Sequence, residues 1–298
     1  MAQEKKFVLI TGCGRGGIGE ALALEYTLRG LRVIATVLPQ ESSDHFSNTG
    51  ITHFPLDVTD EQSIRNLKSE VQALTGGRLD VLVNCAGIAY TMTAIDTDVT
   101  AVQRMFDINV FGPMRMVRSF HDLLIAAKGV VVNIGSIGAS YNASKAALAH
   151  WGNTLRVEMK PLGVKVITVC LGQFSRRGHA LTFLLQIISG EVSTNILKSD
   201  AHRSLPEGSF YSPLAEEFKL HVNRTPAGAT DRFKYAKNVV ATSLQTAPPA
   251  WYWYGSHTSL TRFFDTFGWR TVWDSMMWNM FGLQKLEDAH KGSANKDI

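Results

Sequence analysis

The chain has 298 residues, of which 45% are hydrophobic, and its formal net charge is +4. This length and composition suit one large globular domain, or one domain with an appendage. The small net charge and the lack of a long basic run argue against a nucleic-acid partner.

Short apolar runs alternate with helical patterns along the first 172 residues. The runs predict strands at 7–11, 32–36, 51–57, 80–87, 129–136 and 164–172. The helical patterns lie at 18–29, about 61–74, 102–127 and about 141–160. Continuous apolar strands that alternate with helices indicate a parallel sheet covered on both faces. Right-handed crossovers then give an α/β, doubly wound, Rossmann-type sheet with ligands at the carboxyl ends of its strands.

A glycine-rich segment, TGCGRGGIGEAL at 11–22, joins the first predicted strand to the first predicted helix. Glycine lets backbone N–H groups approach a pyrophosphate closely, and a helix N-terminus adds unsatisfied donors and a positive dipole end. The position between strand and helix favours a dinucleotide-binding loop over an ordinary tight turn. The residues assigned to this loop are Gly12, Gly16, Gly17, Ile18 and Gly19.

The end of the second predicted strand bears on the choice of cofactor. A site for NAD usually has an acid there to bind the ribose 2′-hydroxyl, but no acid occurs at 35–38. Arg15, inside the glycine loop, is able to pair with a 2′-phosphate. We therefore expect NADP(H) as cofactor. The alternative is that Arg15 is merely solvated, and the first acid, Glu41, comes too late to decide the question.

Further motifs follow the glycine loop in a fixed order over about the first 170 residues: Asp57-Val58, NCAG at 84–87, Asn109, Ser136 and YNASK at 141–145. Together they resemble the short-chain dehydrogenase/reductase family. The resemblance implies that Asp57 and Val58 flank the adenine ring. It also implies that Asn84, Ala86 and Gly87 line the cofactor, although Asn84 and Gly87 also fit a simple strand-ending turn.

A tyrosine and a lysine four residues apart share one face of a helix, and Tyr141 and Lys145 have this spacing. An unperturbed tyrosine has a pKa of about 10, and a nearby ammonium lowers it. Tyr141 is therefore the candidate acid/base and Lys145 its activator, and the resemblance adds that Lys145 binds the nicotinamide ribose. Ser136 is the candidate donor to the substrate oxygen. By resemblance, Asn109 anchors a proton-relay water.

Two spacings depart from the family pattern. Only four residues separate Ser136 from Tyr141, fewer than the family usually has. A misplacement of the tyrosine hydroxyl by about 1 Å can cost about a hundredfold in rate. The second departure is an apparent insertion. When residues 172–189 are left out, the sequence after the last predicted strand resembles the family pattern, which implies that Thr194 contacts the cofactor carboxamide. We interpret both departures as gene-model errors; a genuine insertion that forms a lid over the site is the alternative.

The C-terminal part of the chain is rich in aromatic residues, and five of the six tryptophans in the whole chain fall in 251–278. An apolar helical face is predicted from the spacing of Val272, Trp273, Met276, Met277, Met280 and Phe281. Three interpretations stay open: a helix that covers the core, a subunit contact, or an interfacial membrane helix. Further upstream, Phe210, Tyr211 and Leu214 are candidates for an apolar substrate wall.

We expect a dinucleotide-binding domain over 1–256 and a helical extension with a tail over 257–298. Cys13, Cys85 and Cys170 form no CxxC pair and the nine histidines lack paired ligand spacing, so neither a disulfide framework nor a metal site is expected. No secretory signal or bilayer-spanning segment is evident, which predicts a cytoplasmic protein. Peripheral contact with endoplasmic reticulum or lipid droplets stays open, and we expect a homo-oligomer.

Within the family, the extra glycine of TGCGRGGIG, YNASKAAL and the aromatic tail most resemble the fungal NADPH-dependent 1-acyldihydroxyacetone phosphate reductases. This resemblance implies reduction of a ketone on an apolar or lipid-like small molecule. A ketone of secondary metabolism is an equal alternative. The rival from another class is a non-catalytic or impaired NADP-binding, membrane-associated protein whose site was broken by the short loop.

Overall fold

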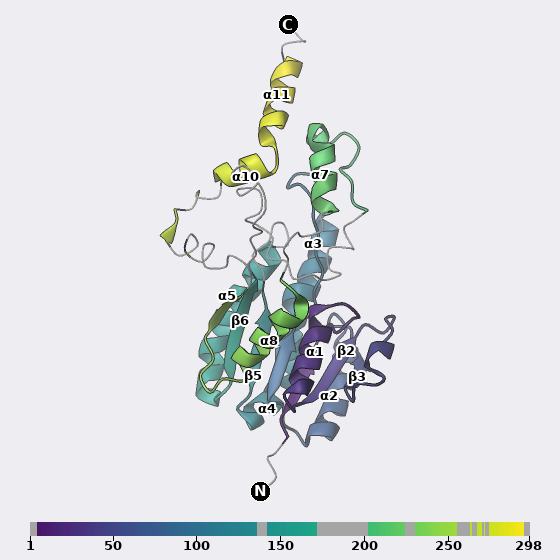
Figure 1. The fold of residues 1–298 in the computed structure, drawn as a ribbon, viewed down its shortest axis with the longest axis vertical. Coiled ribbons are helices and arrows are strands. Elements are labelled where there is room, and N and C mark those ends of the chain that lie inside the picture. Colours follow the sequence, from purple (N-terminus) through teal and green to yellow (C-terminus); the bar gives the residue numbers. More distant parts are fainter. Residues whose placement is uncertain are drawn as a thin grey trace.

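The computed structural model describes residues 5–135, 142–171, 202–223, 230–254, 263, 267–269, 271 and 274–294. At its centre lies a seven-stranded parallel sheet in the order β3-β2-β1-β4-β5-β6-β7 (Figure 1). The strands are β1 (Phe7–Ile10), β2 (Arg32–Val37), β3 (Thr52–Pro55), β4 (Val81–Asn84), β5 (Val130–Ile134), β6 (Lys165–Leu171) and β7 (Trp251–Tyr254).

Helices follow most of the strands and cover both faces of the sheet. The longer ones are α1 (Ile18–Leu28), α2 (Glu61–Thr75), α3 (Val99–Phe106), α4 (Gly112–Ala127), α5 (Asn142–Met159), α7 (Ala215–Val222), α8 (Arg232–Ser243), α10 (Asp274–Met280) and α11 (Leu283–Ala294). Single turns are η1 (Asp44–Phe46), η3 (Lys160–Leu162) and η5 (Ser212–Leu214), and η2 (Asp107–Phe111) is π-helical.

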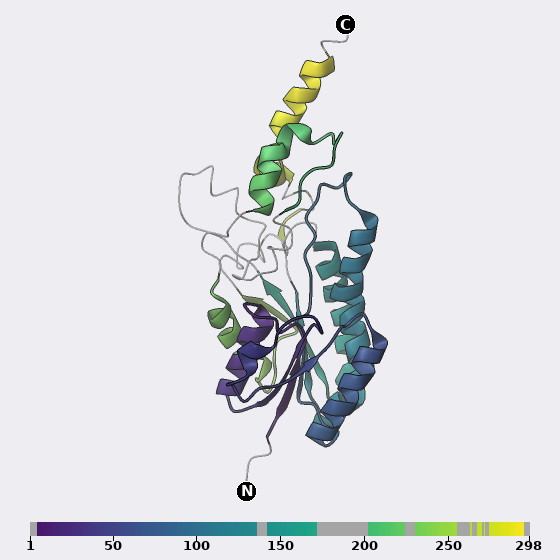
Figure 2. The same cartoon turned by 90° about the vertical axis from the view of Figure 1, so that its right-hand side faces the viewer.

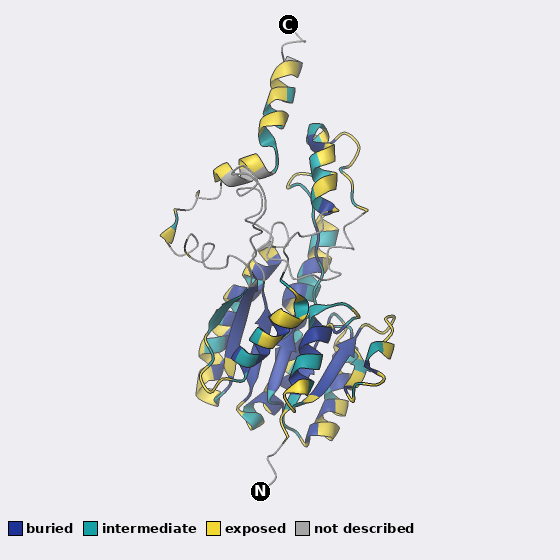
Figure 3. Ribbon diagram, in the orientation of Figure 1, coloured by how far each residue is buried: buried dark blue, intermediate teal, exposed yellow. Residues whose placement is uncertain are grey.

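Alternate strand residues point to opposite faces, so the sheet builds two apolar cores. On one face, Val8 and Ile10 pack with residues of α1 and α8. On the other face, Leu9 packs with residues of α2, α4 and α5. Figure 2 shows these two helical layers on either side of the sheet, and Figure 3 shows that the central strands are buried, whereas the edge strands β3 and β7 are partly exposed. This arrangement confirms the predicted doubly wound α/β fold.

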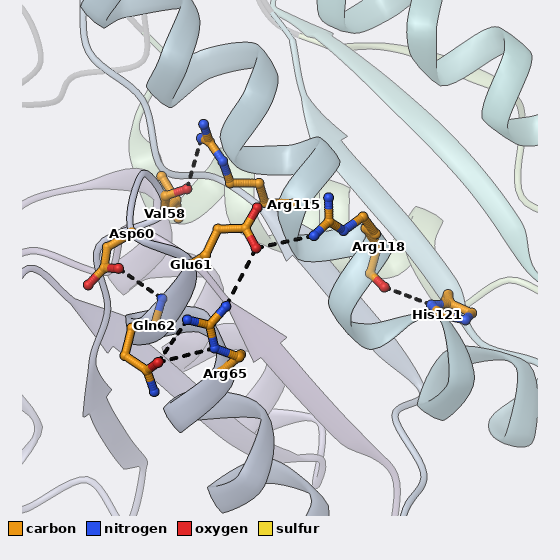
Figure 4. A network of polar contacts seen from close by, with 8 residues as sticks. All are labelled: Val58, Asp60, Glu61, Gln62, Arg65, Arg115, Arg118 and His121. Atoms are coloured by element: carbon orange, nitrogen blue, oxygen red, sulfur yellow. Dashed lines mark hydrogen bonds and ion pairs between the residues drawn. The ribbon is translucent and has the colours of Figure 1, made fainter.

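Charged side chains also join α2 to α4 at the surface (Figure 4). The Glu61 carboxylate accepts a hydrogen bond from Arg118 at 3.1 Å and pairs with Arg65 at 3.7 Å. Arg115 Nη1 donates to the carbonyl oxygen of Val58 at 3.4 Å. Exposed ion pairs contribute about 0–1 kcal/mol each, so the apolar core between these helices dominates their attachment.

The strands and helices predicted up to residue 171 are confirmed within the described residues, with ends that shift by a few positions. The sequence interpretation missed β7, because four consecutive aromatic residues, Trp251–Tyr254, show no alternation of apolar and polar side chains. In the structure this strand pairs with β6, and Tyr252 and Tyr254 pack against the α1/α8 core. Trp251 Nε1 donates to Asn153 Oδ1 of α5 at 2.8 Å.

The sheet's carboxyl end carries an upper region, made of 202–223 and 274–294, that rises away from the N-terminus (Figure 1). Lys285 Nζ of α11 lies 2.9 Å from Glu217 Oε1 of α7, and Phe281 contacts the ring of His221. The helix α10 lies within the segment predicted to be helical, but several side chains of the predicted apolar face fall outside the described residues. No helix in the described parts of the chain is long and apolar enough to cross a bilayer.

Candidate functional site

The glycine loop between β1 and α1 has two positions that admit only glycine. Gly12 has φ +71°, and a Cβ there would lie 2.6 Å from Cα of Ala86. A Cβ on Gly19 would lie 2.3 Å from the carbonyl oxygen of Gly12. Because such contacts are far below van der Waals distance, the loop packs against the end of β4 only with glycine at both positions.

The predicted NCAG motif is joined to this loop by a buried hydroxyl. Thr11 Oγ1 accepts hydrogen bonds from the backbone N–H groups of Cys85 and Ala86, both at 3.0 Å. Since β1 and β4 are neighbours in the order β3-β2-β1-β4, this junction is the topological switch point of the sheet. Open α/β sheets bind ligands at that point.

The start of α1 has the donors that a pyrophosphate needs. The helix begins at Ile18 after Gly17, and the first N–H groups of a helix have no intrahelical partner. Gly16, which precedes the helix, donates its N–H to Glu20 Oε2 at 2.8 Å. Glu20 is almost fully buried, and its carboxylate lies 3.4 Å from Arg232 Nη2 of α8. The donor set and the tight glycine turn fit a dinucleotide.

Three of the predicted site residues converge beyond the end of β4. A Cβ on Gly87 would lie 3.0 Å from Asn109 Oδ1 and 3.5 Å from Lys145 Nζ. Lys145 is 3% exposed, and its ammonium donates to the carbonyl oxygen of Ile134, at the end of β5, at 2.8 Å. Thus β4, β5, η2 and α5 bring one amide and one ammonium to a single point.

Asn109 is fully buried and is held on two sides. Its amide oxygen accepts from Ile88 N–H at 2.9 Å, and its amide nitrogen donates to Ile88 O at 2.9 Å and Ser144 Oγ at 3.1 Å. The side chain therefore fixes the loop after β4 to α5. Asn109 lies in the π-helical turn η2. A regular α-helix cannot continue through this turn, because Pro113 has no N–H to donate to the carbonyl oxygen of Asn109. Such turns are frequent at functional sites.

Cys85 lies beside this cluster and stays a thiol at neutral pH. Burial raises the pKa of the Cys85 thiol to about 12, while the Lys145 ammonium acts in the opposite direction. Burial likewise raises the pKa of Cys13 well above its usual value. None of the three cysteines forms a disulfide. A neutral thiol at position 85 leaves the Lys145 ammonium as the charge at this point of the site.

The side chains of Asp57 and Val58 both make contacts within the protein. Asp57 Oδ1 accepts from both the N–H and the hydroxyl of Thr59, at 2.8 and 2.7 Å, and so shapes the turn before α2. Val58 is buried, and its Cγ2 would lie 2.8 Å from a Cβ on Gly112. Their predicted contact with an adenine ring stays a prediction.

Asn84 also has a structural partner, because its Nδ2 donates to Asn133 Oδ1 of β5 at 2.8 Å. Both amides are buried. This pair joins the carboxyl ends of two central strands. Asn133 was missed in the sequence interpretation, because a single polar residue in an apolar strand shows no partner until strand register is known.

Three predicted residues, Ser136, Tyr141 and Thr194, lie outside the described residues, as do the short loop between the first two and the segment 172–189. Their flanks are described. Gly135 N–H donates to Val169 O at 2.8 Å at the end of β5, and α5 begins at Asn142.

Arg15 forms an ion pair that the sequence interpretation did not contain. Its Nη2 lies 2.6 Å from Oδ1 of Asp44, and the Ser42 hydroxyl donates to the same oxygen at 2.7 Å. Glu41 also reaches the loop, because its Oε2 lies 3.0 Å from the Cβ position of Gly14. Asp44 and Glu41 lie several residues after β2, whereas a ribose-binding acid is expected at 35–38, at the end of that strand.

A seven-stranded parallel sheet with a glycine loop and a buried Asn–Lys cluster at its switch point defines a dinucleotide-dependent oxidoreductase of one particular class. The family model for short chain dehydrogenases matches residues 6–179. The chain therefore belongs to the short-chain dehydrogenase/reductase family.

Relatives extend this similarity over the whole chain. Short-chain dehydrogenase fogD of Aspergillus ruber is 64% identical over 301 residues, covering 98% of this chain and 99% of that protein. Short-chain dehydrogenase virD of Hypocrea virens is 60% identical over 306 residues and covers 100% of both. The NADPH-dependent 1-acyldihydroxyacetone phosphate reductase of Schizosaccharomyces pombe is more distant, at 38% over 232 residues, with 75% of this chain and 73% of that protein covered.

Solved structures show the same fold. A short-chain dehydrogenase from Streptomyces avermitilis matches with a TM-score of 0.70 and 26% identity, covering 93% of this chain and 98% of that one. The KRED1-Pglu enzyme matches with a TM-score of 0.63 and 23% identity over 82% of this chain and 97% of that one.

Proposed function

We propose that the protein is an NADPH-dependent oxidoreductase that interconverts a ketone and a secondary alcohol on an apolar or lipid-like substrate. The observation that carries this proposal is the convergence of Gly87, Asn109 and Lys145 next to the glycine loop. When bound there, the nicotinamide cofactor supplies or accepts the hydride.

The protein's own residues handle the proton and the developing charge. Lys145 lies buried on the first turn of α5, four residues after Tyr141 in the sequence. An ammonium at that spacing favours the phenolate and lowers the pKa of the tyrosine, so that Tyr141 can donate a proton to the carbonyl oxygen. Ser136 hydrogen-bonds the same oxygen, and Asn109 anchors the relay that reprotonates the pair.

The preference for NADPH rests on two features of this chain and one relative. No acid occurs at 35–38, and Arg15 stands in the glycine loop. The Schizosaccharomyces pombe relative is named as NADPH-dependent. The same name supports a lipid-like ketone as substrate; a secondary-metabolite ketone is the other candidate.

The upper region supports an apolar substrate wall only in part. Leu214 is buried, Tyr211 is half-buried, and Phe210 is 68% exposed and packs beside the ring of His290. Exposed aromatic side chains continue at Phe267 and Trp269, which is the feature that favours contact with a membrane or droplet surface. We propose this contact, and a homo-oligomer, as secondary properties of the enzyme.

The test is consumption of NADPH with a panel of apolar ketones, compared between the wild-type chain and Tyr141→Phe. We expect turnover by the wild type and a loss of about a hundredfold or more in the variant, because general acid catalysis contributes 10²–10⁴-fold. NADPH binding, measured by titration, should change little. Binding without turnover in the wild type would favour the non-catalytic alternative, and unchanged turnover in the variant would refute the assigned acid.

A further inference from the structure

The segment after β2 lies along the outer side of the glycine loop and contacts three successive loop residues. Glu41 Oε2 lies 3.0 Å from the Cβ position of Gly14. His45 Nε2 is hydrogen-bonded to the carbonyl oxygen of Cys13 at 2.9 Å. Between these two contacts, Arg15 of the loop pairs with Asp44 of η1. The segment therefore borders the loop at the carboxyl end of β2, where Rossmann-type sheets bind the adenosine ribose.

In the Arg15–Asp44 pair, one carboxylate oxygen of Asp44 accepts hydrogen bonds from two donors, Arg15 and Ser42. Arg15 Nη2 lies 2.6 Å from Asp44 Oδ1, and Ser42 Oγ lies 2.7 Å from the same atom. These two hydrogen bonds, first that from Ser42 and then that from Arg15, hold the pKa of Asp44 below its usual value. Asp44 is thus an anion at neutral pH, and it holds both donors in one place.

A guanidinium and a hydroxyl that converge on one oxygen are also the donors that a phosphate monoester requires. We propose that Asp44 occupies the 2′-phosphate site in the cofactor-free protein, and that NADPH must displace this carboxylate from Arg15 and Ser42 to bind. Asp44 is then a specificity-determining residue that weakens the preference for NADPH over NADH. The proposal rests on the proposed function only in taking a nicotinamide dinucleotide as the ligand.

Charge and exposure indicate that the displacement is easy but measurable. The side chains of Arg15 and Asp44 are 63% and 66% exposed, so water screens their attraction. The Glu41 carboxylate lies 3.0 Å from the Cβ position of Gly14, at the same end of the loop. Neutral Asn at position 44 removes one negative charge from the place where a phosphate dianion would bind, and it weakens the competition for Arg15 because an amide oxygen is a poorer acceptor than a carboxylate.

The experiment measures dissociation constants for NADPH and NADH at one fixed ionic strength, with the wild type, Asp44→Asn, Arg15→Met and the double variant. We expect Asp44→Asn to tighten NADPH by about twofold to fivefold, as befits an exposed pair, and to leave NADH within about twofold. In the Arg15→Met background the gain should be clearly smaller, because only the Ser42 hydroxyl then remains as a donor for which Asp44 competes. The matched control is Asp122→Asn, which removes a surface carboxylate paired with Lys68 at 2.8 Å between α2 and α4.

Three results would overturn the proposal: an unchanged NADPH constant in Asp44→Asn, an equal gain for NADH, or the same gain in Asp122→Asn or in the Arg15→Met background. Failure of the proposed function has a different signature. If NADPH binds but no ketone is reduced, the catalytic assignment is wrong, and the ratio of the two constants still decides the role of Asp44. Absence of binding by either dinucleotide would overturn both.

Discussion

The glycine loop and the upper region are held to the sheet by different kinds of interaction. The loop is fixed by backbone packing, since Gly12 lies against Ala86, and Thr11 binds two N–H groups of the NCAG motif. The upper region is fixed by side chains: Ser209 Oγ donates to Asp96 Oδ2 at 2.6 Å, and Arg203 stacks 4.2 Å over the ring of Tyr90.

Because of this difference, we expect the glycine loop to tolerate few substitutions and the upper region to tolerate many. Backbone contacts at van der Waals distance depend on glycine and on strand register, so the cofactor end accepts few alternatives. Single hydrogen bonds and ring contacts can be exchanged at a cost of about 1 kcal/mol each. The upper region can therefore change its side chains with little effect on the packing of the glycine loop.

The largest effect should come from Lys145→Met, which keeps the length of the side chain and removes the ammonium. Turnover should fall by about a hundredfold to ten-thousandfold, and the KM for NADPH should rise, because in the proposed mechanism the same group stabilises the phenolate and contacts the cofactor. Steady-state kinetics measure both. Lys68→Met, on the surface of α2, is the matched control and should retain turnover. Equal losses in the two variants would show that the assignment of Lys145 is wrong.

Next in size is Gly12→Ala, compared with Gly50→Ala. The two glycines have φ +71° and +72°, but a Cβ meets Ala86 at 2.6 Å in one case and open space in the other. Left-handed backbone costs a non-glycine residue about 1–2 kcal/mol, and overpacking adds about 1–3 kcal/mol at Gly12 alone. Denaturant unfolding should therefore show the larger loss for Gly12→Ala. Equal losses would mean that the loop does not pack on the end of β4.

In the upper region, Ser209→Ala should raise the KM of the ketone about fivefold to tenfold, because a hydrogen bond to a carboxylate is worth about 1.5 kcal/mol or more. Thr93→Ala is the control, since its hydroxyl binds the same Asp96 oxygen at 2.6 Å but joins no second segment. The NADPH dissociation constant should stay the same in both. A KM change as large in Thr93→Ala would contradict a role for the link between the segments.

The smallest effect concerns Glu217 and Lys285, which join α7 to α11. The Lys285 hydrogen bond holds the pKa of Glu217 below its ordinary value of 4.5. A folded-state pKa that is depressed gives stability above the unfolded value and loses it as pH falls through the folded value. The attachment of α11 should weaken only below about pH 4.5, as followed by tryptophan fluorescence, and Glu217→Gln should abolish this pH dependence. A transition that persists unchanged in Glu217→Gln would have another origin.

The same comparison explains what could be predicted from the sequence. Strands such as Val130–Ile134 and the position of the glycine loop follow from local patterns in the sequence. Local patterns do not encode the convergence of Gly87, Asn109 and Lys145, and only the resemblance to the family pointed to these residues as parts of one site. The pairs Arg15–Asp44 and Asn84–Asn133 depend on how separate strands meet, and no spacing along the chain encodes that.

The strand Trp251–Tyr254 could not be predicted, because its local sequence has no periodic pattern. Its side chains are all large, so neither the period of a strand nor that of a helix is visible in the sequence. It becomes a strand because it pairs in parallel with β6 from Thr168 to Leu171, which satisfies backbone groups on that side, and because Tyr252 and Tyr254 pack against the core.

The most direct test of the account follows a labelled hydride. NADPH that carries deuterium at both C4 positions of the nicotinamide ring is incubated with the protein and an apolar ketone, and the alcohol is examined by mass spectrometry and NMR. The account predicts one deuterium at the carbinol carbon for each NADPH oxidised, with the label transferred at least about a hundredfold more slowly by Lys145→Met. Oxidation of NADPH without label in the alcohol, or binding of NADPH without any alcohol, would contradict it.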